Sequence, residues 1–434
     1  MKAAFATLGC RVNQYETEAM IEKFKREGYE IVDFECFSDV YVINTCTVTN
    51  MGDKKSRQMI NRAKRENSNA TIAVVGCYSQ IKPEEVSLID GVDVVLGTRN
   101  KGDIIYWVNR ARDEHKKIVE VSDVLKNNVF EDLNVEEYRD RTRAYVKIQD
   151  GCNRFCSYCL IPYARGAVCS KHPQKVIEEV KKLAEHGFKE VVLTGIHIAS
   201  YGLDIKDEWD LLKLLKEVNK LAGLERIRIG SIDPQFFKSS VIDELSKLEK
   251  LCPHFHLSLQ SGCDETLKRM NRKYTTKEYQ HIVEELRAKI QDVSITTDII
   301  VGFPGETTEE FNKTYEFLKR IELSKMHIFK FSARKGTKAY LMKNDVDGNI
   351  KDERSKKLTS LDAELEKKFR IKYLNKELTV LFEKKINQEK ELYEGYAANY
   401  IRVLAKSTSP IEGKIIKTKI MEDKDGELLG VLLT

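Results

Sequence analysis

Six of the ten cysteines fall into two sets of three that could serve metal chemistry. Cys152, Cys156 and Cys159 stand within eight residues, in the order Cys-x3-Cys-x2-Cys. A structural zinc site needs four protein ligands, whereas three thiolates on a cubane iron–sulfur cluster leave one iron open for another ligand. In a reducing compartment, a chain of this size does not need a disulfide framework. The spacing favours a cluster with an open iron; half of a zinc site, or simply reactive thiols, is the alternative.

The second set of thiols is spread over the first eighty residues. Cys10, Cys46 and Cys77 each follow directly on an apolar run, in ATLGC, VINTC and VVGC, and their separations are each about one strand plus one helix. The strand ends of an open parallel sheet form one edge, so we expect the three thiols to meet there. A single cysteine at a strand end is more simply a small buried residue, but three at equivalent places are not explained in this way.

Alternating strands and helices are predicted to position both sets. Residues 1–115 are predicted to form an open parallel α/β sheet, and the charged, poorly periodic residues 116–143 a linker. The predicted strands of this sheet are 2–8, 40–45, 71–76 and 92–97, and the predicted helices are 16–27, 54–65 and one that begins at 83.

A second alternating series predicts a partial (β/α)6 barrel over residues 144–375. Its predicted strands are 144–150, 190–195, 226–231, 254–260, 295–302 and 326–331, with a long helix near 352–378 at the end. The loop with Cys152 follows the first of these strands, on the face where barrel enzymes keep their active sites. Short β runs over 376–434 predict a small C-terminal β-barrel. The fold class is therefore α/β with an added β-barrel.

Bulk composition excludes some classes of protein. The 434 residues are 41% hydrophobic and 32% charged, and contain no apolar run of eighteen residues, which predicts a soluble cytoplasmic protein without a membrane span. The formal charge of +5 does not by itself indicate nucleic-acid binding. A basic run at 53–66, DKKSRQMINRAKRE, is typical of a solvated helix face, but beside a metal site it could also guide a phosphate backbone.

The stretch 152–159 resembles the signature of the radical S-adenosylmethionine (SAM) enzymes. In that superfamily three cysteines hold a [4Fe–4S] cluster, and the amino and carboxylate groups of SAM bind the fourth iron. The resemblance extends to TGIH (194–197), SLQSG (258–262) and IIVGFPGE (299–306), although each motif alone could be a strand end that turns at a glycine. The SAM-contacting residues that it implies are Tyr158, Thr194, Gly195, Ser231, Gln260 and Gly302.

The first domain resembles the N-terminal domain of the methylthiotransferases. GCRVNQYETE, NTCTVTNMGDKKSRQ and GCYSQ carry the likeness, which implies that Cys10, Cys46 and Cys77 bind a second [4Fe–4S] cluster. The C-terminal domain resembles the RNA-binding TRAM domain, with side chains suited to bases and phosphates at Tyr396, Asn399, Tyr400 and Arg402. The family usually has RGxxRSR after the cluster loop, whereas this chain has RGAVCSK, in which Cys169 replaces a basic residue.

These likenesses cover the chain in the module order of the methylthiotransferases. GCRVNQYETE looks most like the branch that acts on N6-threonylcarbamoyladenosine at position 37 of tRNA. The resemblance implies two SAM molecules, one as radical source and one as methyl donor, the tRNA anticodon loop as partner, and an electron donor such as flavodoxin or ferredoxin. Isopentenyladenosine tRNA or a ribosomal-protein aspartate remains an alternative substrate. A non-enzymatic, metal-containing RNA-binding protein is the alternative of another class.

Overall fold

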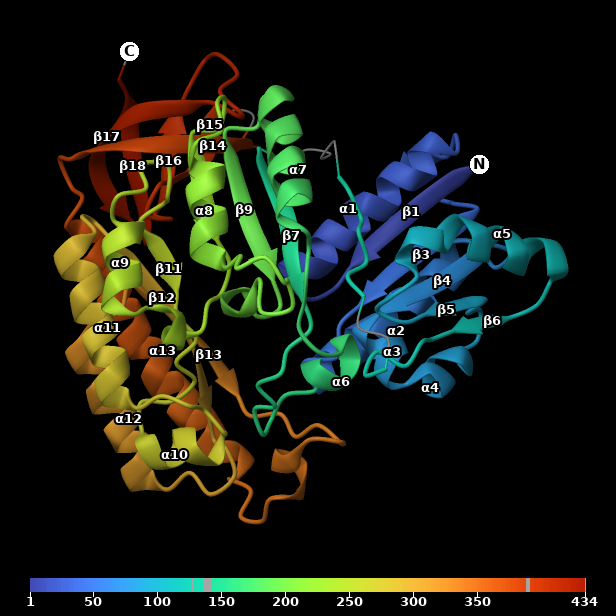
Figure 1. Cartoon of the computed structure of the whole chain (residues 1–434), viewed down its shortest axis with the longest axis horizontal. Helices are drawn as coiled ribbons and strands as arrows, with labels where there is room; N and C mark the ends of the chain where they lie inside the picture. The colour runs from blue at the N-terminus through green and yellow to red at the C-terminus, as the bar shows by residue number, and fades with distance from the viewer. Residues whose placement is uncertain (127–128, 136–141, 388–390, 434) are drawn as a thin grey trace.

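Three parts follow one another along the chain in the computed structural model, which describes residues 1–126, 129–135, 142–387 and 391–433. Figure 1 shows a helix-flanked sheet at the N-terminus, an open barrel in the middle and a small β-barrel at the C-terminus. The predicted α/β fold class, with its partial (β/α)6 barrel and its C-terminal β-barrel, is confirmed.

The N-terminal sheet is parallel throughout, in the order β2-β1-β3-β4-β5-β6. Its strands are β1 (Lys2–Thr7), β2 (Glu30–Val32), β3 (Val40–Thr45), β4 (Thr71–Gly76), β5 (Val94–Leu96) and β6 (Ile118–Glu120). Its helices are α1 (Arg11–Arg26), α2 (Asn50–Glu66), α3 (Cys77–Ile81), α4 (Pro83–Ser87) and α5 (Ile104–Glu114). β3 and β4 are buried on both faces, which explains their continuous apolar sequences. The short edge strands β2 and β6 are not predicted, and β6 comes from the segment interpreted as a linker.

Six parallel strands form the central barrel. They are β7 (Arg143–Asp150), β9 (Glu190–Gly195), β10 (Arg226–Ile229), β11 (His254–His256), β12 (Ser294–Val301) and β13 (Lys325–Lys330). The main outer helices are α7 (Pro173–Glu185), α8 (Leu211–Asn219), α9 (Ser239–Leu245), α11 (Thr276–Lys289) and α12 (Thr308–Ile321). Short elements lie between them: α6 (Ile161–Arg165), β8 (Cys169–Ser170) and α10 (Asp264–Arg269). Parallel bridges at Ile227–Leu251 and Ile232–Leu257 join β10 to the β11 segment. Among the described strands β13 does not pair with β7, so the barrel is open there.

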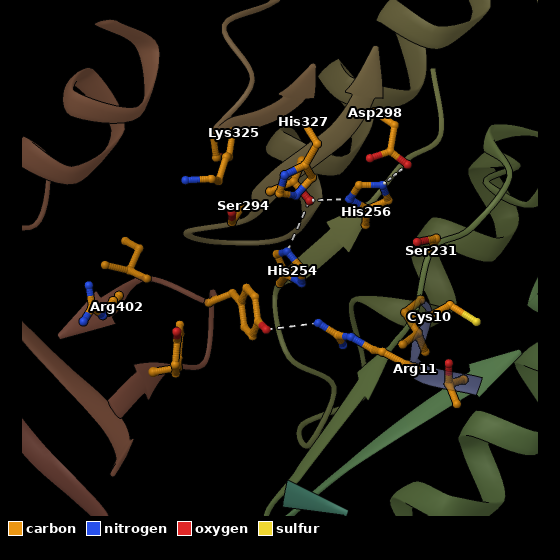
Figure 2. Close-up of a pocket in the computed structure, with 18 of the residues that line it drawn as sticks. Cys10, Arg11, Ser231, His254, His256, Ser294, Asp298, Lys325, His327 and Arg402 are labelled. Atoms are coloured by element: carbon orange, nitrogen blue, oxygen red, sulfur yellow. Dashed lines mark hydrogen bonds and ion pairs between the residues drawn. The ribbon is translucent and has the colours of Figure 1, made fainter. Parts of the chain in front are cut away.

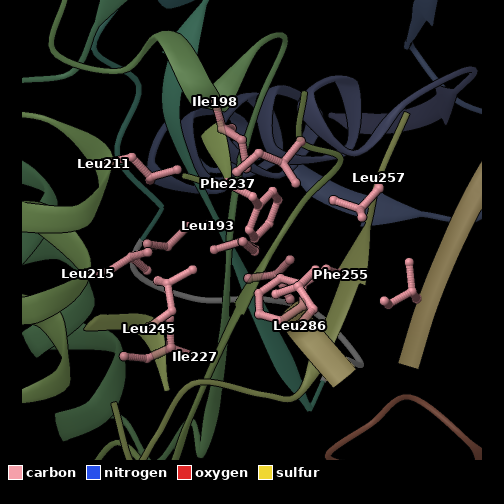
Figure 3. Packing of buried hydrophobic residues seen from close by; sticks show 14 of the residues in the cluster. Leu193, Ile198, Leu211, Leu215, Ile227, Phe237, Leu245, Phe255, Leu257 and Leu286 are labelled. Carbon is pink, nitrogen blue, oxygen red and sulfur yellow. The ribbon is translucent and has the colours of Figure 1, made fainter. Parts of the chain in front are cut away.

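The main hydrophobic core lies between the barrel strands and the outer helices. Figure 3 shows Leu193 and Ile227 of the strands packed with Leu211, Leu215 and Leu245 of the helices. Apolar packing is thus on the outside of the sheet. This leaves the inner face available for other side chains.

The last helix and strands complete the chain. α13 (Gly348–Ile371) buries Leu358, Leu361 and Leu365 against the barrel. The closed C-terminal barrel has its own core and the order β14-β15-β16-β18-β17. Its strands are β14 (Glu377–Asn387), β15 (Leu392–Ala397), β16 (Arg402–Lys406), β17 (Ile415–Lys424) and β18 (Glu427–Leu432). None of the described helices combines the length and the apolar character needed to cross a membrane.

Candidate functional site

Cys10, Cys46 and Cys77 lie at one edge of the N-terminal sheet. Thr45 and Gly76 are paired in register, so Cys46 and Cys77 leave neighbouring strands at the same level. A Cβ at Gly9 would lie 2.6 Å from the Cβ of Cys46, so the chain just before Cys10 passes directly against that residue. Burial, followed by the charge of Cys77, raises the pKa of Cys46 to about 12. The structure places these thiols together, and their role as cluster ligands stays a prediction.

The loop that carries Cys152, Cys156 and Cys159 begins at the end of β7 and offers donors to sulfur. The backbone N–H of Arg154 donates to the Sγ of Cys152, and the Arg272 guanidinium donates to the Sγ of Cys156, both at 3.4 Å. Burial raises the pKa of Cys159 to about 12, with the charges of Cys156 and Cys152 adding to it. Hydrogen bonds to sulfur stabilise thiolates that bind a metal cluster. No sequence signal indicates Arg272, which lies 116 residues from Cys156.

Two adjoining cavities reach the two sets of thiols. Cys10 lines a cavity of about 1060 Å³, and Cys159 lines one of about 280 Å³. Val48, Ile161 and Asp298 belong to the walls of both cavities. A ligand at this junction would therefore lie between the two sets of thiols.

Most of the residues implied to contact SAM line these cavities. Thr194, Gly195 and Ser231 line the large one, and Tyr158 and Gln260 line the small one. Gly302 belongs to neither lining: its backbone N–H donates to the Glu306 carboxylate at 2.7 Å. The structure therefore brings five of the six implied residues to the cavities and places Gly302 outside them.

All three parts of the chain contribute walls to the large cavity (Figure 2). Arg11, the first residue of α1, donates to the Tyr400 hydroxyl of the C-terminal barrel at 3.0 Å. Tyr400 also stacks on His254 of β11 and on Tyr396, with ring centroids 4.7 and 5.0 Å apart. Burial opposes ionisation of Tyr400, but the guanidinium groups around it outweigh burial and lower its pKa. Tyr396 and Tyr400 thus face the central barrel.

A buried charge network joins α1, β7 and α6, which adjoin Cys10, Cys152 and Cys159 in the sequence. Lys147 lies 2.8 Å from the Glu16 carboxylate and 2.7 Å from that of Asp150. Arg165 contacts the same two carboxylates at 2.9 and 3.1 Å, and it donates to Asn13 at 2.6 Å. These cations outweigh the effect of burial and lower the pKa values of Glu16 and Asp150. The network consists of Glu16, Arg99, Lys101, Lys147, Asp150 and Arg165.

Arg99 supplies a charge beside Cys169. Its guanidinium donates to the Sγ of Cys169 at 3.4 Å and lies 3.1 Å from the Asp150 carboxylate. It therefore brings a positive charge to the place where relatives are expected to have a basic residue in the RGxxRSR element. The long sequence separation of 70 residues hides this contact from sequence reasoning.

The donor sets suit iron–sulfur clusters. Each of the two sets offers three thiols. Metal binding requires them as thiolates, so a cluster held by three thiolates carries a negative charge. Among the ion-paired side chains of the network bases outnumber acids four to two, and Glu131 adds one further carboxylate near Lys101. A buried excess of basic side chains needs negative partners. An anionic group at Cys77 would provide one, because Arg165 lies against that thiol.

Comparison with known proteins gives matches along the whole chain. Residues 146–318 match the Radical SAM superfamily, and residues 2–97 match the uncharacterized protein family UPF0004. The chain is 46% identical to "Threonylcarbamoyladenosine tRNA methylthiotransferase MtaB" of Bacillus subtilis (strain 168), over 96% of this chain and 93% of that protein. The protein of the same name from Aquifex aeolicus (strain VF5) is 41% identical, over 97% and 100%. "tRNA-2-methylthio-N(6)-dimethylallyladenosine synthase" of Clostridium tetani (strain Massachusetts / E88) is 34% identical, over 98% and 94%.

Among solved structures, the chain is similar to the radical SAM methyltransferase TsrM from Kitasatospora setae. The TM-score is 0.57 with 15% sequence identity, over 76% of this chain and 75% of that one. This likeness shows a shared fold.

Proposed function

The chain belongs to the radical SAM tRNA methylthiotransferases, and we propose that it methylthiolates C2 of N6-threonylcarbamoyladenosine at position 37 of tRNA. The observation that carries the proposal is the pair of adjoining cavities, one lined by Cys10 and the other by Cys159. A base placed at their junction has access to both sets of thiols. The names of the two most similar relatives described above support this substrate over its dimethylallyl counterpart.

We propose Cys152, Cys156 and Cys159 as ligands of one [4Fe–4S] cluster and Cys10, Cys46 and Cys77 as ligands of another. When bound, these groups supply one-electron cleavage of SAM to a 5′-deoxyadenosyl radical at one site and sulfur delivery at the other, with a methyl group from a second SAM. The electrons would come from a small carrier such as flavodoxin or ferredoxin.

The protein's own residues position the reactants. Arg154 and Arg272 donate to the sulfur atoms of Cys152 and Cys156, which fixes the loop around the first site. Thr194, Gly195 and Ser231 provide the wall along which we place SAM. The reacting edge of a stacked base is hidden, so the base must leave its stack in the anticodon loop to enter the cavity.

An exposed basic face supports tRNA binding. On α2, Lys54, Lys55 and Arg65 are exposed, and no carboxylate of the described residues lies within ion-pair distance of any of them. By contrast, Arg62 and Lys64 of the same helix are paired with Glu35 and Asp90. We propose that the unpaired lysines and arginine contact phosphates. We also propose an N-terminal domain of 1–115 to which β6 adds a strand, a linker over the rest of 116–143, the barrel of 144–375, and a TRAM domain over 376–434.

Nucleoside mass spectrometry of tRNA tests the proposal. A strain that lacks the gene should lose 2-methylthio-N6-threonylcarbamoyladenosine and accumulate its precursor, and the intact gene should restore the product. A gene with alanine at Cys46 serves as the matched control and should not restore it. Loss of the dimethylallyl derivative instead would replace the proposed substrate, and unchanged tRNA would contradict tRNA methylthiolation by this chain.

A further inference from the structure

The inner face of the second half of the barrel is polar. Side chains alternate along β11, β12 and β13, and those that line the large cavity are His254, His256, Ser294, Thr296, Asp298, Lys325 and His327 (Figure 2). Their neighbours Phe255, Ile295 and Met326 point outward into the hydrophobic core. Parallel barrels usually fill the interior with branched apolar side chains. This interior is instead a chamber lined with hydrogen-bonding groups, which suits a polar ligand.

Strand register brings these groups together. Thr296 is paired with His256 on one side and with Lys325 on the other, and Asp298 is paired with His327. The His256 ring lies 3.0 Å from the Thr296 hydroxyl through Nδ1 and 3.2 Å from the Asp298 carboxylate through Nε2. The Thr296 hydroxyl also lies 3.4 Å from His254. His256 is thereby fixed in orientation by two partners, so the wall is preorganised.

Arg11 is a cation of this chamber that needs an anion. Lys325 lies 3.0 Å from Glu366, and Arg402 is paired with Glu394 and Glu427. Among the described residues, no carboxylate lies within ion-pair distance of Arg11.

Two aromatic rings hold the Arg11 side chain in place. Its guanidinium donates to the Tyr400 hydroxyl and lies over the rings of Tyr145 and Tyr400, 5.6 and 5.9 Å from their centroids. Arg11 therefore presents a fixed positive charge to whatever enters the chamber. A guanidinium binds carboxylates and phosphates well.

We infer that this chamber binds the N6 substituent of the substrate base, that the substituent carries a carboxylate, and that Arg11 binds this carboxylate. The inference rests on the proposed function and assigns the side chains that recognise the substrate. The polar wall formed by Asp298 and His327, with His256 held against Asp298, takes the uncharged polar atoms of the substituent. An apolar substituent of similar size would leave the Arg11 guanidinium without an anionic partner, which is a strong source of discrimination.

The test compares three anticodon stem-loop RNAs with enzyme that carries its full iron content. One RNA has N6-threonylcarbamoyladenosine, the second its uncharged methyl ester and the third N6-dimethylallyladenosine. We expect the native enzyme to bind the acid about 10- to 100-fold more tightly than the ester, by fluorescence anisotropy, with a matching difference in kcat/KM. In Arg11→Met this preference should fall to within about 2-fold, and Arg11→Lys should restore part of it.

Two further variants separate recognition from structure. Tyr400→Phe removes the hydroxyl that holds Arg11 and should reduce the preference for the acid by about 3- to 10-fold. Arg370→Met removes a cation of the same cavity that already has two carboxylate partners, Glu366 and Asp423, and should leave the preference unchanged. Iron content is measured for each variant, since Arg11 follows Cys10.

The outcomes distinguish this inference from the proposed function. If Arg11→Met keeps its iron and still prefers the acid over the ester, the inference is wrong. Equal weakening for all three RNAs would assign Arg11 to a phosphate of the RNA backbone and would also overturn it. If the native enzyme methylthiolates the RNA with N6-dimethylallyladenosine and not the one with N6-threonylcarbamoyladenosine, the proposed substrate is wrong.

Discussion

The guanidinium of Arg165 lies 2.9 Å from the Glu16 carboxylate in a fully buried ion pair. Glu16 follows Cys10 on α1, and Arg165 follows Cys159 at the end of α6. The pair therefore joins the segments that follow Cys10 and Cys159, one thiol of each set, and these segments belong to different parts of the chain.

Replacing Arg165 by Met should destabilise the protein by about 3–5 kcal/mol, because it leaves the buried Glu16 and Asp150 without a main partner. Urea unfolding, followed by tryptophan fluorescence, measures the effect. Lys175→Met is the control: this exposed side chain pairs with Asp132, and its loss should cost less than about 1 kcal/mol. Equal unfolding midpoints for Arg165→Met and the native protein would contradict the role given to the network.

Gly151→Ala should prevent the loop that carries Cys152, Cys156 and Cys159 from forming. Gly151 has φ +71°, and a Cβ there would lie 1.8 Å from the carbonyl oxygen of Ala167. Gly187 is a matched control, because it also has positive φ, at +92°, but a Cβ there would meet nothing within 4 Å. We expect Gly187→Ala to cost only about 1 kcal/mol. Iron analysis should show loss at the Cys152 site in the first variant alone, and normal iron in both would refute the prediction.

Iron content also tests the two sets of thiols separately. Changing Cys152, Cys156 and Cys159 together to Ala should remove about four irons per chain and leave the others, and the same change at Cys10, Cys46 and Cys77 should do the reverse. Cys36 is an exposed thiol outside both sets, so Cys36→Ala should change nothing. Iron and acid-labile sulfide analysis after anaerobic reconstitution gives the result. Full iron in either triple variant would reject that set as ligands.

Asp362→Asn should stabilise the protein at neutral pH. Burial raises the pKa of Asp362 to about 6, and the Glu366 carboxylate adds to this. Because the folded state disfavours the ionised form, the penalty is absent below about pH 4 and complete above about pH 6. Allowing for its partial exposure, we expect a gain of about 1–2 kcal/mol at pH 7 and none at pH 4.

The asparagine keeps the acceptor for the backbone N–H of Met326, which lies 2.6 Å from Asp362 Oδ1. Urea unfolding at pH 4 and pH 7 measures the difference. The exposed Glu353 of the same helix is the control, since replacing an exposed side chain by Gln should change the unfolding midpoint little. A gain of the same size at both pH values would show that ionisation is not the cause.

Local sequence patterns predict much of this fold, because a short apolar run is enough to indicate a strand and the residue at which it ends. The runs before Cys10, Cys46 and Cys77 are strands, and parallel pairing then places their ends at one edge. The three-residue strands β2 and β6 are not predicted, because a strand so short carries almost no alternation of its own.

Contacts between distant segments are beyond such patterns. Nothing near Cys10 in the sequence indicates that Arg165 reaches Asn13, 152 residues away. The polar chamber wall is an exception, because the alternation in HFH, SITTD and KMH already shows polar side chains at every second position. A strand in a barrel with one polar face predicts a lined cavity.

Tyr400 and Arg11 are separated by 389 residues, yet their contact closes the wall of the large cavity. A ribosome that adds about 5–20 residues per second needs roughly 20–80 s to cover that distance. During this time the thiol of Cys10 belongs to a nascent chain whose reaction chamber has no far wall. If metal centres are assembled before the chain leaves the ribosome, they are therefore assembled in a cavity that is open on one side. Folding of the C-terminal barrel would then close that side.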